Sequence, residues 1–188
     1  MTPTANTYFS GGGLISFSRI WEMPNSNTFD MKGVRKLIKK YLKPEYYSVD
    51  PFANKNKLAK VTNDLNPDMP TDYHLDALDF LKLFPDSSVD FVFYDPPYSP
   101  RQVSEMYKSF GLKVTQESTQ ATWRKRHLDE IARITKAGSI VMSFGWNSSG
   151  VGVRRGFAIK EILLINHGGS HNDTIVVVEE KMRTIFDR

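Results

Sequence analysis

The chain has no cysteine and only four histidines among its 188 residues. The absence of cysteine excludes disulfides and thiolate metal sites, and the histidines do not have the spacing of zinc ligands. Apolar runs of about 18 residues or more are also missing, so no membrane-spanning helix is expected. The sequence does not open with a charged segment followed by an apolar stretch, which argues against a secretory signal. These absences favour a cytoplasmic protein that holds no metal and contacts no membrane.

Composition and charge point to a folded protein with an anionic partner. Hydrophobic residues make up 40% of the chain and charged residues 24%, which is typical of a single globular domain over residues 1–188. The net charge of +4 favours an anionic partner. Positive charge is concentrated in three segments. Residues 32–43 are interpreted as a solvated helix face, and residues 124–126 and 154–155 as phosphate contacts.

Strands and helices alternate along most of the chain, which predicts an α/β fold with a mostly parallel sheet. Residues 1–18 are rich in Thr, Ser, Asn and Gly and are expected to form a flexible arm. Residues 99–122 are polar and are expected to be irregular. The last two strands can pair as a hairpin that adds a reversed edge strand, and Gly138 is expected to end the helix before it. The expected helices are 28–42, 76–84 and 122–136, and the expected strands are 46–49, 60–65, 73–75, 89–94, 139–144, 157–166 and 173–180.

Two consecutive prolines follow the apolar strand expected at residues 89–94. The tetrapeptide is Asp95, Pro96, Pro97 and Tyr98. Prolines have fixed φ angles and donate no backbone hydrogen bond, so this segment is stiff and presents a carboxylate, free carbonyls and an aromatic ring. Ligands of open α/β sheets bind at the carboxyl ends of strands, where this segment is expected to lie. Asp-Pro-Pro is also ordinary turn chemistry, so a plain turn is the alternative.

The same residues suit chemistry on an exocyclic amine. The lone pair of such an amine is delocalised into the base, so the amine must be held and its lone pair directed at an electrophilic methyl group. Asp95 and the carbonyl of Pro96 can each accept one N–H, which also stabilises the positive charge that develops during transfer. Tyr98 can stack on a base that has left its duplex. Together with Pro97, which keeps the segment rigid, these residues are the catalytic candidates.

The tetrapeptide resembles motif IV of the amino-group DNA methyltransferases, in the form found in adenine-N6 enzymes. Over nearly its whole length the chain looks like the small adenine-specific DNA methylases often found in phages and prophages. The resemblance implies a Rossmann-like class I methyltransferase fold with a mostly parallel seven-stranded sheet, an antiparallel edge strand and helices on both faces. It also implies S-adenosylmethionine as cofactor, DNA as partner, and methylation of adenine N6 at specific sites, as in restriction-modification systems.

The resemblance also assigns cofactor-binding residues at successive strand ends. Carboxylates there can accept the ribose hydroxyls and the adenine amine of the cofactor, and aromatic rings near the sulfonium can add cation–π attraction or simply belong to the core. The loop at residues 54–58 contains no glycine, so Asn54 or Asn56 is expected to adopt the left-handed conformation instead. The cofactor candidates are Asp50, Pro51, Phe52 and Ala53 (motif I), Asp64 (motif II), Asp76 (motif III) and Phe29 as an aromatic contact.

No separate target-recognition domain fits after the last expected strand. Recognition must come from the segments 99–126, 145–156 and 167–172, from a specificity partner, or from a second copy of the chain. For His171 and Asn172, ordinary turn chemistry weighs as much as a role in the base pocket. The substrate-binding candidates are Trp146, Asn147, His171 and Asn172 around the target base, and Arg124, Lys125 and Arg126 on the phosphates.

Several alternatives stay open. Asp rather than Ser at position 95 favours adenine over cytosine N4, and an unpaired adenine in RNA needs no flipping. A non-catalytic nucleic-acid-binding relative would keep the fold, and the glycine-free loop leaves room for an inactive enzyme. A nicotinamide dehydrogenase is disfavoured, because no Gly-x-Gly-x-x-Gly follows the first expected strand after the helix.

Overall fold

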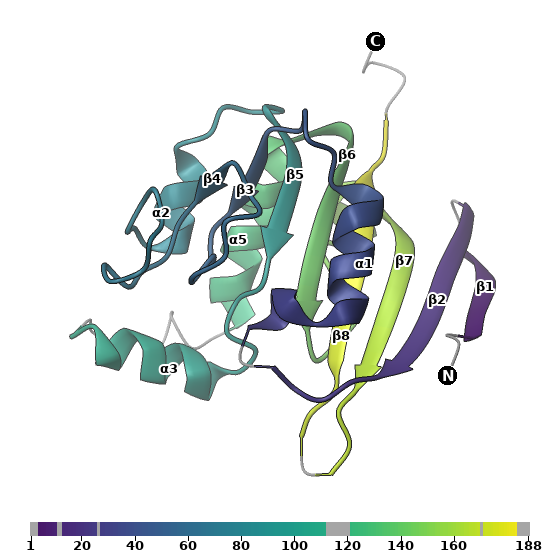
Figure 1. Ribbon diagram of the computed structural model, residues 1–188. Helices are drawn as coiled ribbons and strands as arrows, with labels where there is room; N and C mark the ends of the chain where they lie inside the picture. Colours follow the sequence, from purple (N-terminus) through teal and green to yellow (C-terminus); the bar gives the residue numbers. More distant parts are fainter. Residues whose placement is uncertain (1–3, 11–12, 26, 112–120, 170, 184–188) are drawn as a thin grey trace.

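The protein is built around one eight-stranded sheet with helices on both faces (Figure 1). The computed structural model describes residues 4–10, 13–25, 27–111, 121–169 and 171–183. The strands are β1 (Thr4–Ser10), β2 (Gly13–Trp21), β3 (Ser48–Asp50), β4 (Val61–Thr62), β5 (Val89–Tyr94), β6 (Thr135–Gly145), β7 (Phe157–Asn166) and β8 (Thr174–Lys181). The helices are α1 (Lys32–Tyr41), α2 (Ala77–Lys82), α3 (Pro100–Ser109) and α5 (Ala121–Ile134), with short 3-10 turns η1 (Thr28–Asp30) and η2 (Val153–Arg155). In the part of the chain described, no helix is long and apolar enough to cross a membrane.

Two hydrophobic cores hold α1, α2 and α5 against the sheet. On one face, Leu37 of α1 belongs to the same core as Phe93 of β5. On the other face, Phe80 of α2 and Ile131 of α5 share a core with Val92 of β5. From Phe91 to Tyr94, successive residues of β5 therefore enter opposite cores, which explains why this part of the strand is apolar on both faces. Figure 1 shows α1 in front of the sheet and α5 behind it.

The strand directions bring most carboxyl ends to one edge of the sheet. The strand order is β1-β2-β7-β8-β6-β5-β3-β4. Strands β4, β3, β5 and β6 are parallel, and β7 and β2 run in the same direction beyond the reversed strand β8. This confirms the predicted Rossmann-like, mostly parallel sheet. The reversed strand of the C-terminal hairpin lies inside the sheet, however, and the antiparallel edge strand is β1.

The N-terminal segment forms two strands, β1 and β2, that the sequence did not predict. The expectation of a flexible arm over residues 1–18 is wrong for its described part, because β1 and β2 form an antiparallel hairpin. Strand β2 continues to Trp21, which pairs with Asn166 at the end of β7. The segment is rich in β-branched and aromatic residues, which favour strands. Pairing with β2 also satisfies backbone groups of β7 that would otherwise be exposed at an edge.

Other elements also differ from those expected. The connection after residue 98 contains helix α3, which starts with Ser99 as its cap and a proline in its first turn. Helix α5 passes directly into β6, so Gly138 lies inside that strand, with a φ of 80°, and does not end the helix. The strands expected at 60–65 and 73–75 shrink to β4 and an isolated parallel bridge. Part of the long connection, residues 112–120, lies outside the described residues.

Candidate active site

Acidic side chains gather where β3 and β5 end. Asp50 is the last residue of β3, and Asp95 directly follows β5. The Asp50 carboxylate is completely buried and accepts a hydrogen bond from the backbone N–H of Phe52 at 3.0 Å. Burial raises the pKa of Asp50 to about 8, and the neighbouring carboxyl groups of Asp95 and Asp64 add to the shift. The parallel sheet thus brings three acidic residues, far apart in sequence, to one edge.

The loop after β3 closes around Asp64 without glycine. Asn54 has a φ of 51°, which confirms that an asparagine takes the left-handed conformation here. Its backbone N–H donates to Asp64 Oδ2 at 2.9 Å, and the N–H of Asn66 donates to Oδ1 at 2.9 Å. Both oxygens of Asp64 have a backbone donor, so the direction of this carboxylate is fixed by the loop.

A small cavity of about 30 Å³ lies between Asp64 and Asp76. Asp76 caps α2, with its Oδ1 accepting the N–H of Leu78 at 3.0 Å. Its Oδ2 accepts a hydrogen bond from the hydroxyl of Tyr107 in α3, and the indole N–H of Trp123 donates to that hydroxyl at 3.3 Å. Helix α3, which lies below the strand ends in Figure 1, therefore closes the cavity. The cavity is also lined by Pro51, Phe52, Leu65, Leu75, Ala77 and Met106.

An aromatic cluster adjoins this cavity. The ring centroid of Phe52 lies 5.9 Å from that of Tyr94, 6.1 Å from Trp123 and 5.8 Å from His127. Burial lowers the pKa of His127 to about 4, so its imidazole is neutral at physiological pH. The guanidinium of Arg124 lies 5.6 Å from the centre of the Tyr94 ring. This side of the site is therefore a largely apolar aromatic wall with one cation beside it.

Two hydroxyl groups orient the carboxylate of Asp95. The Tyr98 hydroxyl donates to Asp95 Oδ1, and the Thr28 hydroxyl is a second donor. Burial raises the pKa of Asp95 to about 6, while these hydrogen bonds favour the ionised form and limit the shift. Pro96, which follows, is buried, and Pro97 is half-buried. The carboxylate is thus held in one direction before any ligand binds.

A second cavity, of about 320 Å³, opens beside Tyr98. Trp146, which follows β6, lines it, and its ring centroid lies 5.7 Å from that of Tyr98 in an edge-on arrangement. His171 and Asn172 line it from the loop between β7 and β8. Its volume is at the lower end of the range for small-molecule pockets and suits one planar base. The remaining lining residues are Pro24, Asn25, Thr28, Met31, His167 and Thr174.

Other sequence candidates lie elsewhere. Asn147, expected beside the target base, lines a separate cleft of about 200 Å³ with Arg124 and Lys125. The chain turns away from the base-sized cavity after Trp146, so Asn147 is placed among cations. Phe29, expected near the cofactor, is 5% exposed, because η1 directs its ring into the core at 5.4 Å from a phenylalanine ring of β5. Ala53 is buried, and Arg126 is exposed.

Two residues that contact the site carboxylates were not recognisable as site residues in the sequence. Thr28 reads as an ordinary helix cap, yet its hydroxyl reaches Asp95. Tyr107 lies in a segment read as irregular, yet it hydrogen-bonds to Asp76. For Tyr107 a signal existed, because Ser99 followed by proline is a typical helix start and predicts α3. For Thr28 no local signal exists, since only the fold brings it to Asp95.

Comparison with known proteins addresses the fold. No model of a known family matches the chain, and neither does any curated protein sequence. The structure of TrmN from Thermus thermophilus matches 79% of the chain with a TM-score of 0.53 and 16% identity, and the match spans 48% of TrmN, about half its length. A SAM-dependent methyltransferase from Archaeoglobus fulgidus matches 79% of the chain and 91% of its own, with a TM-score of 0.53 and 12% identity. The chain has the fold of S-adenosylmethionine-dependent methyltransferases. At these identities the likeness concerns the fold.

Proposed function

We propose that the protein transfers a methyl group from S-adenosylmethionine to the N6 amine of adenine in DNA. The observation that carries this proposal is the position of Asp95. Its carboxylate is electrostatically coupled to Asp50, within the acidic group at the strand ends, and is hydrogen-bonded to Tyr98 at the base-sized cavity. A carboxylate that interacts with a residue of each site can hold the target amine where the methyl group arrives.

In this proposal the protein acts mainly by orientation. S-adenosylmethionine, when bound, supplies an electrophilic methyl carbon, and its sulfonium becomes a neutral thioether as the methyl group leaves. Asp95 and the carbonyl of Pro96 accept the two N–H groups of the amine, so that its lone pair points at that carbon. They also stabilise the positive charge that forms on nitrogen, and one proton then passes to Asp95 and on to water. Tyr98 and Trp146 hold the base through their rings.

The residues around the small cavity fit the cofactor chemically. The carboxylate of Asp64 can accept ribose hydroxyls, Asp76 can accept the adenine amine, and Phe52 offers an aromatic surface beside them. The cavity of about 30 Å³ is far below the roughly 300–1,000 Å³ of ligand pockets, so α3 must move before a cofactor can enter. The Tyr107 hydroxyl occupies the acceptor that the adenine amine would use.

Removing this hydroxyl should make cofactor binding tighter. In Tyr107→Phe, Asp76 loses a partner that competes with the adenine amine, while the aromatic ring stays. We expect the affinity for S-adenosylmethionine in calorimetry to rise roughly 2- to 13-fold, which corresponds to one hydrogen bond of about 0.5–1.5 kcal/mol. Tyr73→Phe, at an exposed tyrosine, is the matched control. Equal or weaker binding by Tyr107→Phe would show that α3 does not compete with the cofactor.

Methyl transfer should fail at acid pH. Asp95 must be ionised to accept an N–H, and its pKa is raised to about 6, so the single-turnover rate should fall as the pH drops through about 6. The hydrogen bond from Tyr98 lowers this pKa. In Tyr98→Phe the pKa should therefore rise, and the midpoint of the profile should move to higher pH. Asp50, with a pKa of about 8, is the other buried carboxyl nearby, and Asp50→Asn separates its titration from that of Asp95. A midpoint that moves to lower pH in Tyr98→Phe contradicts this assignment.

The function itself is tested by transfer of a labelled methyl group from S-adenosylmethionine to DNA. We expect label on N6 of adenine in oligonucleotides that contain adenine, and none in matched oligonucleotides in which thymine replaces it. Nucleoside analysis of the product distinguishes N6-methyladenine from N4-methylcytosine. Cofactor binding in calorimetry without transfer to any nucleic acid would identify a non-catalytic relative of the fold.

A further inference from the structure

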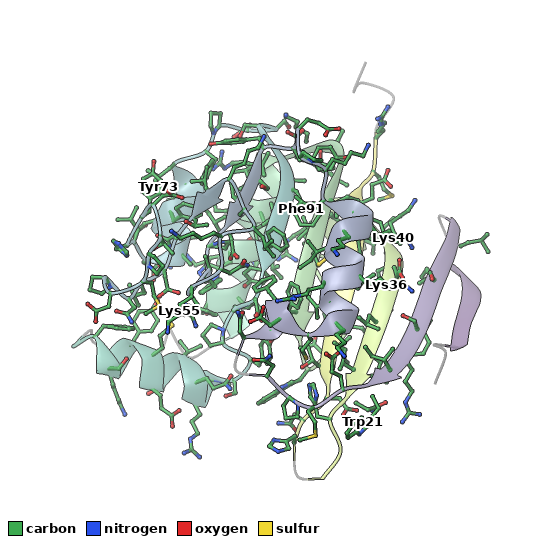
Figure 2. The ribbon with its side chains drawn as sticks, in the orientation of Figure 1. Trp21, Lys36, Lys40, Lys55, Tyr73 and Phe91 are labelled. Carbon is green, nitrogen blue, oxygen red and sulfur yellow. The ribbon has the colours of Figure 1, made fainter. Side chains whose placement is uncertain are left out.

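An exposed indole lies at the end of the extra strand β2. Trp21 is 66% exposed and pairs through its backbone with Asn166, the last residue of β7. Because β2 runs parallel to β7, Trp21 lies at the same sheet edge as Asp95. Figure 2 shows its side chain at this lower edge, beside the loop between β7 and β8. The N-terminal hairpin therefore adds an aromatic side chain to the edge that holds the site.

The backbone next to Trp21 is fixed to the β7–β8 loop. The N–H of Glu22 donates to the carbonyl of Asn166 at 3.1 Å, and Nδ1 of His167 lies 2.7 Å from the carbonyl oxygen of Glu22. Asp173 accepts hydrogen bonds from the side-chain amide of Asn166 and from the backbone N–H of His167. The indole is consequently presented from a rigid backbone, which lowers the entropy cost of a contact made by its ring.

The indole also lies directly against this loop. A Cβ atom on Gly168 would be 3.3 Å from the indole nitrogen of Trp21, and Gly168 has a φ of 72°. The positive φ favours glycine there, and a Cβ atom would be in tight contact with the ring. Two residues that follow in the loop, His171 and Asn172, line the base-sized cavity. The cavity and the Trp21 ring are thus contacted by the same short loop.

The surroundings of the cavity have the chemistry of a surface that binds a nucleotide strand. Trp146, at the cavity wall, is 40% exposed, and Met23 is 60% exposed close to Trp21 in the chain. Arg19, two residues before Trp21, is exposed and donates to the side chain of Asn166. Exposed aromatic rings stack on bases, and neighbouring cations lie along the phosphates. This combination favours a strand whose base faces are open.

We propose that the substrate is an unpaired nucleotide strand and that Trp21 stacks on a base next to the target adenine. This inference rests on the proposed function and names its substrate class. In a duplex, the neighbours of the extruded base stay paired and expose only the faces toward the gap inside the helix, so they cannot leave the helix to lie on Trp21. In an unpaired strand the neighbouring base is free to lie on the indole while the target base occupies the cavity.

The first test measures binding of the full chain to a labelled DNA strand with one adenine, to the same strand in a duplex, and to the corresponding RNA strand. We expect the single strand to bind more tightly than the duplex. Trp21→Ala should weaken single-strand binding roughly 5- to 100-fold, with little change for the duplex. The salt dependence should stay the same, because stacking releases no counterions. Tighter binding of the RNA strand than the DNA strand would identify RNA as the source of the unpaired strand.

Matched variants separate stacking from folding. Trp21→Phe keeps an aromatic ring and should recover most of the affinity. Leu14→Ala removes another exposed apolar side chain, 56% exposed, from the opposite end of β2 and should leave binding unchanged. Thermal melting of each variant shows whether the hairpin is still folded. A Trp21→Phe protein that melts like the wild type but binds as weakly as Trp21→Ala contradicts stacking.

The second test locates the stacked base. An abasic site at one of the two positions next to the adenine should weaken single-strand binding as much as Trp21→Ala does. Combining this abasic site with Trp21→Ala should weaken binding no further, because both changes remove the same contact. The proposal is overturned if the loss caused by Trp21→Ala adds to the loss caused by an abasic site at each of the two positions next to the adenine. It is also overturned if the protein binds the duplex and the single strand with equal affinity. The proposed function fails separately, if the wild-type protein transfers no labelled methyl group to adenine in either form of DNA.

Discussion

Replacing Asp95 by alanine should lower the rate of methyl transfer roughly 10²- to 10³-fold, the usual cost of losing one preorganised group that stabilises developing charge. The affinity for S-adenosylmethionine should stay nearly unchanged, because the Asp95 carboxylate is bonded to Tyr98 and Thr28 and does not line the cavity proposed for the cofactor. Single-turnover transfer measures the rate, and calorimetry measures the affinity. Asp95→Asn should also be slow, since an amide is a weaker acceptor and turns N–H donors toward these hydroxyls.

The control for this prediction is an aspartate on the surface of the same molecule. Asp79 in α2 is paired with Lys82, and its side chain is 65% exposed. Asp79→Ala should transfer methyl groups at the wild-type rate. If Asp95→Ala melts at the wild-type temperature and transfers methyl groups at the wild-type rate, Asp95 takes no part in the methyl transfer. The assignment of the cofactor-binding residues would not be affected by that result.

Replacing Asp64 by alanine should weaken binding of S-adenosylmethionine roughly 10- to 100-fold, which corresponds to about 1.5–3 kcal/mol for charged hydrogen bonds to the ribose. Two backbone N–H groups, from Asn54 and Asn66, already direct this carboxylate, so little entropy is lost when a hydroxyl binds. Asp68→Ala, at an exposed position in the same loop, is the control. Unchanged calorimetric affinity in Asp64→Ala would place the ribose elsewhere.

Asp76→Ala should show a smaller loss, for a reason specific to this structure. The substitution removes the partner of the adenine amine, but it also removes the acceptor that holds Tyr107 in the cavity. In a Tyr107→Phe background the competing hydroxyl is already gone, so the loss caused by Asp76→Ala should be larger there than in the wild type. Additive effects of the two substitutions would mean that Asp76 and Tyr107 do not act on the same cofactor group. Asp76→Asn, which can keep the helix cap, controls for damage to α2.

The central part of the fold could be predicted because its signals are local. The apolar run at residues 89–94 belongs to a strand that is buried on both faces, and the polar ends of such strands meet at one edge wherever the sheet is parallel. The left-handed Asn54 could be anticipated for the same reason: a tight loop without glycine needs a residue that tolerates a positive φ. The proximity of Asp50, Asp64 and Asp95 follows from topology.

Features that depend on long-range contacts could not be predicted. The N-terminal strands are stabilised by pairing with β7, more than 100 residues later, and composition alone made them read as a flexible arm. Thr28 and Phe29 are neighbours in one short turn, but the Phe29 ring enters the core, whereas the Thr28 side chain reaches Asp95. Residue type does not distinguish these fates. The separation of Asn147 from Trp146 likewise depends on the path of the loop after β6.

The hairpin of β1 and β2 has a consequence for handling the protein. Strand β7 pairs with β8 on one side and with β2 on the other. A version of the chain shortened to begin at α1 would leave the β2 side of β7 open, with unpaired N–H and C=O groups along the apolar sequence Ile162 to Ile165. Open apolar edges of this kind recruit strands from other molecules. We therefore expect truncation to make the protein self-associate through β7, because β2 covers this apolar edge in the full chain.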